Sequence, residues 1–263
     1  MCIKILLNKV AFYQEIFHMK FSFSKCILIV FILLAAGTIS PGTVFGAGSA
    51  STVRVLCYGD SNTYGYDPDP TNDRYAYPER WTGILQNRLG VNYQILEEGK
   101  NGRATGYFPD GRIPAPEEGP EDLIARLDRH QPVDILVIML GTNDCVPGMG
   151  LRAEDVAAGM ETLVSAVEAW SDQTGTVRPE IVITVPPAAN KNILRASYAA
   201  QDAEDFYNKT RKIGELYQDI ADRHNCLFAD ARSAEVSELD NTHLTKEGHK
   251  QVAELLLGIL LSN

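Results

Sequence analysis

The chain has 263 residues, of which 45% are hydrophobic and 22% charged, enough for one globular domain with a substantial core. It carries 24 basic against 34 acidic side chains, a formal net charge of −10. So acidic a surface repels phosphate backbones, which excludes nucleic acid as an expected partner. The five cysteines form no C-x-x-C pair, which argues against a zinc site or a disulfide-stabilised scaffold.

Residues 1–50 are expected to be a signal peptide and leader that precede the folded domain at 51–263. Lys20 and Lys25 lie just before an apolar run at 26–36, and small residues follow it. This order is typical of a secretory signal, and the run is shorter than the roughly 20 residues of a membrane span. We therefore expect a secreted or periplasmic protein without stable membrane insertion once the leader is removed. An uncleaved membrane anchor is the alternative, and either Met1 or Met19 is the start.

After the leader, apolar β-branched runs alternate with segments of helical periodicity. The apolar runs predict strands at 53–58, 93–96, 133–140, 180–185 and 226–229. The periodic segments predict helices at 78–90, 120–130, 153–170, 206–224 and 245–261. Strands that are apolar throughout and alternate with helices predict an α/β fold, with a parallel sheet covered on both faces.

Four of the predicted strands lead into polar segments. These segments are GDSN at 59–62, EEGKNGR at 97–103, GTND at 141–144 and DNTH at 240–243. In a parallel α/β sheet, the loops after the strands emerge at one edge, where ligands bind. We therefore expect the four segments to converge, whatever the function.

Together these segments contain the parts that acyl transfer requires. Ser61 supplies a nucleophile, and the spacing of Asp240 and His243 lets an acid orient a base. Asn143 and Gly102, with the Ser61 N–H, supply donors for an oxyanion. Each has a plainer interpretation alone, such as a polar turn, an Asx turn or a local capping pair. Their joint occurrence favours a catalytic site.

In this order, the four segments resemble the sequence blocks of GDSL-type esterases and lipases of the SGNH hydrolase superfamily. The resemblance spans 55–249, with Asn62 where the family usually has Leu. It implies a flavodoxin-like three-layer α/β/α sandwich with a five-stranded parallel sheet. It assigns a catalytic triad and an oxyanion hole, which are Ser61, Asp240 and His243, and Ser61, Gly102 and Asn143.

Three longer stretches, GDSNTYGYDP, RYAYPERWTGIL and EEGKNGRAT, are similar to the arylesterase and acyltransferase branch of that superfamily. The implied function is hydrolysis of short-chain, acetyl-type carboxylic esters through an acyl-enzyme, with no metal and no organic cofactor. The implied partners are a small-molecule or glycan ester and further copies of the chain in a homo-oligomer. Asn62, Tyr64 and Tyr107 are the expected substrate contacts.

Other functions remain open at this point. A carbohydrate O-acetylesterase, a thioesterase, a lysophospholipase and an acyltransferase all use the same five residues. An inactive glycan-binding module is an alternative of another class. A metal-dependent hydrolase is a third, with its ligands drawn from Asp60, Asp144, Asp240 and His243.

Overall fold

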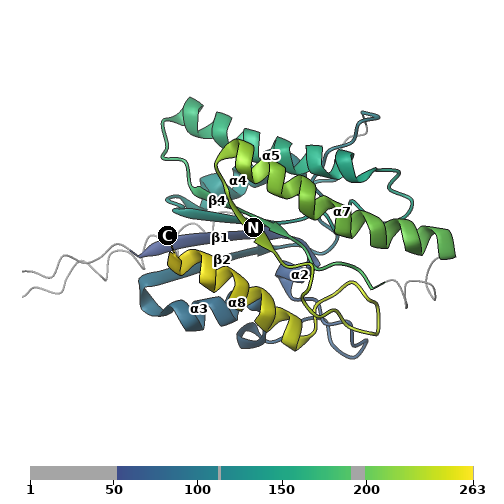
Figure 1. Ribbon diagram of the computed structural model, residues 1–263. Helices are drawn as coiled ribbons and strands as arrows, with labels where there is room; N and C mark the ends of the chain where they lie inside the picture. Colours follow the sequence, from purple (N-terminus) through teal and green to yellow (C-terminus); the bar gives the residue numbers. More distant parts are fainter. Residues whose placement is uncertain (1–51, 112–113, 191–198, 263) are drawn as a thin grey trace, which may run out of the picture. The chain divides into compact units, whose positions relative to one another are not determined.

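A computed structural model describes residues 52–111, 114–190 and 199–262 (Figure 1). The predicted leader, 1–50, lies outside these residues. Within them, no helix is both long enough and apolar enough to cross a membrane. Three cysteines fall in this part of the chain, and all three are free thiols, with Cys57 and Cys145 buried and Cys226 half-buried.

The centre of the fold is one sheet of five parallel strands. The strands are β1 (Val53–Gly59), β2 (Tyr93–Gly99), β3 (Ile135–Met139), β4 (Glu180–Val185) and β5 (Leu227–Asp230). Their order across the sheet is β2-β1-β3-β4-β5, the flavodoxin-like order. The predicted fold class is confirmed. β2 continues three residues beyond its predicted end because its ladder with β1 runs on to the Gly59–Gly99 pair.

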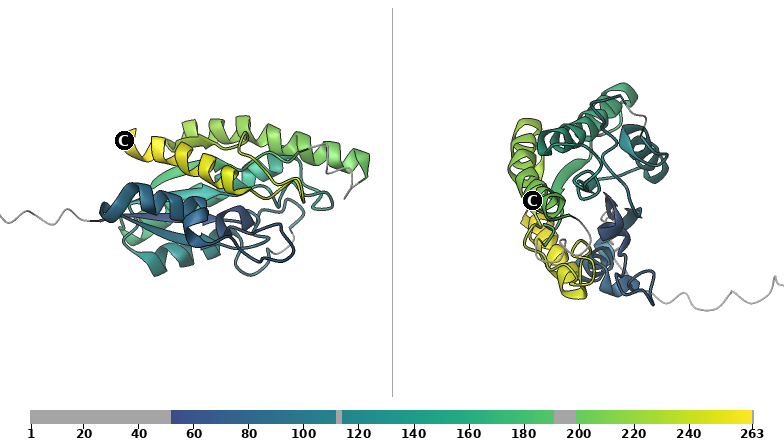
Figure 2. Two further views of the ribbon diagram at one scale, coloured as in Figure 1. Left: turned by 90° about the horizontal axis from the view of Figure 1, so that it is seen from below. Right: turned by 90° about the vertical axis from the view of Figure 1, so that its right-hand side faces the viewer.

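Helices cover both faces of this sheet (Figures 1 and 2). On one face lie α4 (Gly119–His130), α5 (Ala153–Thr174) and α7 (Ala200–His224), and on the other α3 (Trp81–Leu89) and α8 (Lys246–Ser262). Alternate side chains of β1 enter the two cores, with Leu56 and Tyr58 facing the first layer and Val55 and Cys57 the second. The three layers expected from the sequence are therefore present.

Among the described residues there are also three short helical turns, and one of them carries a predicted site residue. They are α2 (Ser61–Tyr64) and the 3₁₀ turns η2 (Tyr77–Glu79) and η3 (Gly90–Asn92).

Charges at the helix ends match the helix dipoles. α4 begins with Glu121 and Asp122 in its first turn and ends with Arg129 and His130 in its last. At the start of α5, the carboxylate of Asp155 accepts the Arg152 backbone N–H at 2.9 Å. These local signals explain why both ends of α4 and the start of α5 lie within one residue of their predicted positions.

The strand order determines where a ligand would sit. β1 lies between β2 and β3. The chain first crosses from β1 to β2 on one side and then returns past β1 to β3 on the other side, so the strand order reverses at β1. In open α/β sheets, ligands bind outside the carboxyl ends of the strands at such a switch point. The polar segments after β1, β2 and β3 all begin there, at 59–62, 97–103 and 141–144.

Candidate active site

Ser61 is the first residue of the one-turn helix α2, which begins directly after β1. Asp60 caps this turn, because its Oδ1 accepts the Asn62 N–H at 2.8 Å. Gly59 allows the close packing, since a β-carbon there would lie 2.0 Å from Thr63 Oγ1. The turn holds Ser61 at the carboxyl end of β1, with 6% of the residue's surface exposed.

Ser61, His243 and Asp240 form a continuous chain of hydrogen bonds. The Nε2 of His243 lies 2.8 Å from Ser61 Oγ, and its Nδ1 lies 2.5 Å from Asp240 Oδ2. The other oxygen of Asp240 accepts the backbone N–H groups of Thr242 and His243, both at 3.1 Å. Asp240 therefore fixes its own turn with one oxygen and the imidazole with the other.

The hydrogen bonds of Asp240 determine its ionisation. Burial opposes the charged form, but hydrogen bonds from the His243 ring and from two backbone N–H groups outweigh it and lower the pKa of Asp240. A charged Asp240 keeps the proton of neutral His243 on Nδ1. Nε2 is then an acceptor that faces the Ser61 hydroxyl, the arrangement a general base requires.

Asn62 has a role other than the predicted substrate contact. Its side chain bridges to the loop that carries His243: Oδ1 accepts the Leu244 N–H at 2.9 Å, and Nδ2 donates to the Thr242 carbonyl at 3.4 Å. Only 1% of the residue is exposed. Because both polar atoms are bonded and the side chain is buried, the structure places Asn62 as a link that holds His243 near Ser61.

The two predicted oxyanion residues outside α2 lie along one cavity. Asn143 Nδ2 donates to the Arg103 carbonyl at 3.0 Å. An amide NH₂ has two hydrogens, so this bond orients Asn143 and leaves the second hydrogen available. Gly102 has φ +78°, a left-handed conformation that favours glycine, and a β-carbon there would meet nothing within 4 Å.

A buried hydrogen-bond pair joins the loop after β2 to the loop after β3. Thr105 donates its backbone N–H and its hydroxyl to Asp144 Oδ1, at 3.0 Å and 2.6 Å. Asp144 is fully buried, and this burial raises its pKa to about 6 despite the bonds from Thr105. Thr105 was not among the predicted site residues, although it lies in the stretch EEGKNGRAT that resembles the arylesterase and acyltransferase branch.

A cavity of about 420 Å³ adjoins Gly102 and Asn143. Its volume falls within the range of about 300 to 1,000 Å³ that small-molecule pockets occupy. The other residues that line it are mostly apolar, and they are Ala104, Phe108, Ala115, Glu118, Val146 and Met149. A bound ester therefore has room beside the two oxyanion residues.

Neither tyrosine predicted to contact substrate lines this cavity. The hydroxyl of Tyr64 donates to Asp73 at 3.2 Å, and the guanidinium of Arg74 lies 4.0 Å from its ring centre. Tyr107 packs beside Gly159 of α5. Tyr66 instead lies at the site, with its ring centre 4.5 Å from that of His243.

The residues proposed as metal ligands do not form one cluster. Asp60 bonds the Asn62 N–H, and Asp144 bonds Thr105. Over the parts of the chain that the structure describes, no three His, Cys, Asp or Glu side chains are grouped as a metal site.

Residues 57–251 match the GDSL-like Lipase/Acylhydrolase family. The chain belongs to this family. The predicted resemblance is therefore confirmed, and the protein is an SGNH-type ester hydrolase, as expected. No curated protein sequence gives a match to this acylhydrolase.

Solved structures of esterases are similar over most of their length. A carbohydrate acetylesterase family member from Sinorhizobium meliloti is 34% identical, with a TM-score of 0.71 over 80% of this chain and 98% of that one. A putative arylesterase from Agrobacterium tumefaciens is 30% identical, with a TM-score of 0.69 over 80% and 99%. The aryl esterase of M. smegmatis is 28% identical, with a TM-score of 0.69 over the same shares.

Proposed function

We propose that this GDSL-like acylhydrolase cleaves short-chain, acetyl-type esters through an acyl-enzyme on Ser61. One observation carries the proposal: Asp240, His243 and Ser61 are joined by contacts of 2.5 Å and 2.8 Å. Asn143 and Gly102 line a cavity where an ester carbonyl can bind. The geometry thus supplies nucleophile, base, orienting acid and oxyanion donors.

The reaction proceeds in two halves. Nε2 of His243 takes the Ser61 proton as Oγ attacks the ester carbonyl, and the Gly102 N–H, the Asn143 amide and the Ser61 N–H stabilise the oxyanion. The alcohol leaves with the proton from His243, and the acyl group stays on Ser61. Water then attacks this acyl-enzyme with His243 again as base, which releases the acid and restores Ser61. Asp240 stays charged throughout and stabilises the imidazolium.

Acetylated carbohydrates are the substrate class we favour among the alternatives. The support is the 34% identity to a carbohydrate acetylesterase family member. The cavity of about 420 Å³ is also much larger than an acetyl group and has room for part of an alcohol such as a sugar. We further propose that the leader exports the enzyme, which would bring it to extracellular acetylated glycans.

A chain-length series tests the reaction. Purified residues 47–263 and Ser61→Ala are assayed on p-nitrophenyl acetate, butyrate and octanoate, with circular dichroism to show that both proteins fold. We expect turnover that falls with chain length and is lost in Ser61→Ala. Turnover that persists in Ser61→Ala would contradict the serine mechanism.

Release of acetate from acetylated xylan, compared with p-nitrophenyl acetate, tests the substrate class. We expect a higher kcat/KM for the glycan. A folded enzyme that cleaves the aryl ester and leaves the glycan untouched would contradict a carbohydrate substrate, while the esterase proposal would stand.

A further inference from the structure

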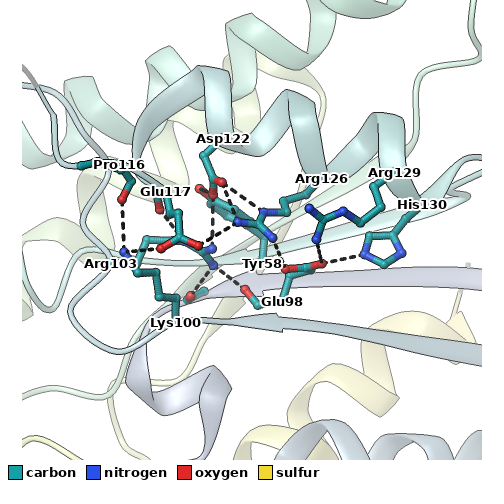
Figure 3. A network of polar contacts seen from close by, with 11 residues as sticks. Tyr58, Glu98, Lys100, Arg103, Pro116, Glu117, Asp122, Arg126, Arg129 and His130 are labelled. Carbon is teal, nitrogen blue, oxygen red and sulfur yellow. Dashed lines mark hydrogen bonds and ion pairs between the residues drawn. The ribbon is translucent and has the colours of Figure 1, made fainter. Parts of the chain in front are cut away.

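Arg103 is among the most buried large side chains in the described part of the chain, with 1% of its surface exposed. It lies between the carboxyl ends of β1 and β2 and the start of α4, within a network of charged residues (Figure 3). The mechanism proposed above gives this guanidinium no part. A buried cation is costly unless its hydrogen bonds are satisfied, so its partners indicate what it does.

Three of its four acceptors are backbone carbonyls. The guanidinium donates to the carbonyls of Gly59 at 2.9 Å and Glu117 at 3.1 Å, and also to that of Glu98. Gly59 ends β1 and stands two residues before Ser61, and Glu98 lies near the end of β2. The Arg103 side chain therefore joins the strand that carries the nucleophile to the strand that leads into the oxyanion loop.

The fourth acceptor is Asp122, which does not depend on Arg103 for its counter-charge. Arg103 Nη2 lies 3.2 Å from Asp122 Oδ2, while Arg126 pairs with Asp122 Oδ1 at 2.9 Å. Tyr58 also donates its hydroxyl to Asp122 at 2.9 Å, and its ring lies under the Arg103 guanidinium at 4.1 Å. Charge neutralisation alone thus does not account for Arg103. Its rigid fork of donors suits the three carbonyls.

The backbone of Arg103 adjoins both oxyanion donors that lie outside α2. Its carbonyl accepts the Asn143 Nδ2 hydrogen at 3.0 Å, which orients that amide. The preceding residue is Gly102, whose N–H is the second proposed donor. Arg103 thus positions both donors through its backbone, and its side chain donates a hydrogen bond to the carbonyl at the end of β1.

We propose that Arg103 is a positioning residue that fixes the oxyanion hole relative to Ser61. The proposal rests on the roles given above to Gly102 and Asn143. Oxyanion donors act when they are held in place before the charge develops, so a small displacement lowers transition-state stabilisation more than substrate binding. Arg103 therefore acts on kcat through its neighbours and touches no reacting atom.

The test is Arg103→Met, which keeps an apolar chain over Tyr58 and removes every donor. We expect kcat on p-nitrophenyl acetate to fall about 100-fold, close to the loss of one oxyanion donor and equivalent to about 2.7 kcal/mol of transition-state stabilisation. KM should change less than about threefold, because ground-state contacts remain.

Arg126→Met is the matched control. Arg126 belongs to the same network and pairs with the carboxylates of Glu98, Glu117 and Asp122. Its loss removes one partly buried cation but none of the hydrogen bonds that Arg103 donates to backbone carbonyls. We expect its melting temperature to fall while its kcat stays within about threefold of the wild type.

A boronic acid inhibitor gives a readout that reports directly on the oxyanion hole. Ser61 Oγ bonds to boron, its proton passes to His243, and the tetrahedral adduct places an oxygen in the oxyanion hole. We expect the inhibition constant to rise in Arg103→Met in parallel with the loss of kcat/KM, and to stay unchanged in Arg126→Met.

A kcat for Arg103→Met within threefold of the wild type would overturn the proposal, as would an equal loss in Arg126→Met. If Arg103→Met does not fold, Arg103→Lys replaces it: Lys keeps the charge but lacks the planar fork, and a full kcat there would also overturn the proposal. A wild-type enzyme without Ser61-dependent turnover would instead refute the proposed function, so the two failures are distinguishable.

Discussion

The two sides of the site differ in how deeply their charged groups are buried. On the oxyanion side, formed by 102–105 and 141–145, Arg103 is 1% exposed and Asp144 is fully buried. In the acid–base loop, 237–245, the side chains of His243 and Asp240 are 21% and 31% exposed. Oxyanion donors act by holding a fixed position, whereas the base, His243, must pass a proton to the leaving alcohol and accept one from water.

The two sides are also held by different means. The oxyanion side is held by buried side chains of its own residues, Arg103 and the Thr105–Asp144 pair. The acid–base loop is held by its own backbone and by Asn62, which bridges the residues on both sides of His243. We therefore expect changes in the acid–base loop to affect rate without unfolding the protein, and changes on the oxyanion side to affect stability as well.

The largest effect is expected for Asp240→Asn. The amide loses the charge that holds the proton of His243 on Nδ1, and kcat should fall about 10,000-fold. Asn keeps an oxygen that can accept the Thr242 and His243 N–H groups, so we expect a loss of about 1 kcal/mol, which lowers the melting temperature by about 2 to 4 °C. Steady-state kinetics and a thermal melt check both statements, and a loss of less than tenfold in kcat would contradict the role of Asp240.

An intermediate effect is expected on stability when Asp144 is replaced by Asn. Burial raises the pKa of Asp144 from its ordinary 3.8 to about 6 in the folded protein. Between about pH 4 and 6 the folded state thus binds the extra proton, so the contribution of Asp144 to stability falls as the pH rises through this window. The Asp144→Asn variant lacks this titration and should gain on the wild type by about 2 kcal/mol from pH 4 to pH 7.

Urea unfolding of the two proteins at several pH values measures this difference. Asp60, whose pKa burial also raises to about 6, titrates in both proteins, so its contribution cancels in the comparison. A difference in unfolding free energy that is constant from pH 4 to 7 would show that Asp144 is not protonated as the structure requires.

The smallest effect is expected for Tyr66→Ala. The Tyr66 ring packs against His243, and the loss of such a ring contact, worth about 0.5 to 1.5 kcal/mol, should lower kcat by at most about tenfold. Tyr66→Phe keeps the ring and serves as the control, with a kcat within about twofold of the wild type. A larger loss in the Phe variant would give the hydroxyl a part in the reaction that the ring contact does not explain.

The architecture was predictable because it rests on patterns repeated over many residues. Five apolar runs alternate with amphipathic segments, and each strand end in the structure lies within three residues of its predicted position. The convergence of the polar segments followed from the parallel sheet alone. The pairing of Asp240 with His243 is local in the chain, which is why their spacing pointed to it.

Contacts between distant segments were not predictable from one sequence. Nothing near Arg103 indicates that its side chain turns back to Gly59, 44 residues away. The substrate role expected for Asn62 rested on its place beside Ser61, yet the partners of its side chain lie 180 and 182 residues along the chain. The four-residue helix α2 was also missed, because a polar turn and a single helical turn share the same sequence pattern.

The direction of α8 has a practical consequence for handling the enzyme. This helix begins at Lys246, just after His243, and runs back along the sheet for 17 residues, about 25 Å. Its last residue, Ser262, and the first residue of β1, Val53, thus lie at the amino ends of the strands, whereas Ser61 lies at the carboxyl ends (Figure 1). A bead or carrier domain attached at either end of the described chain would leave the active site facing the bulk solution. The immobilised enzyme should therefore remain accessible to large substrates, including polymers.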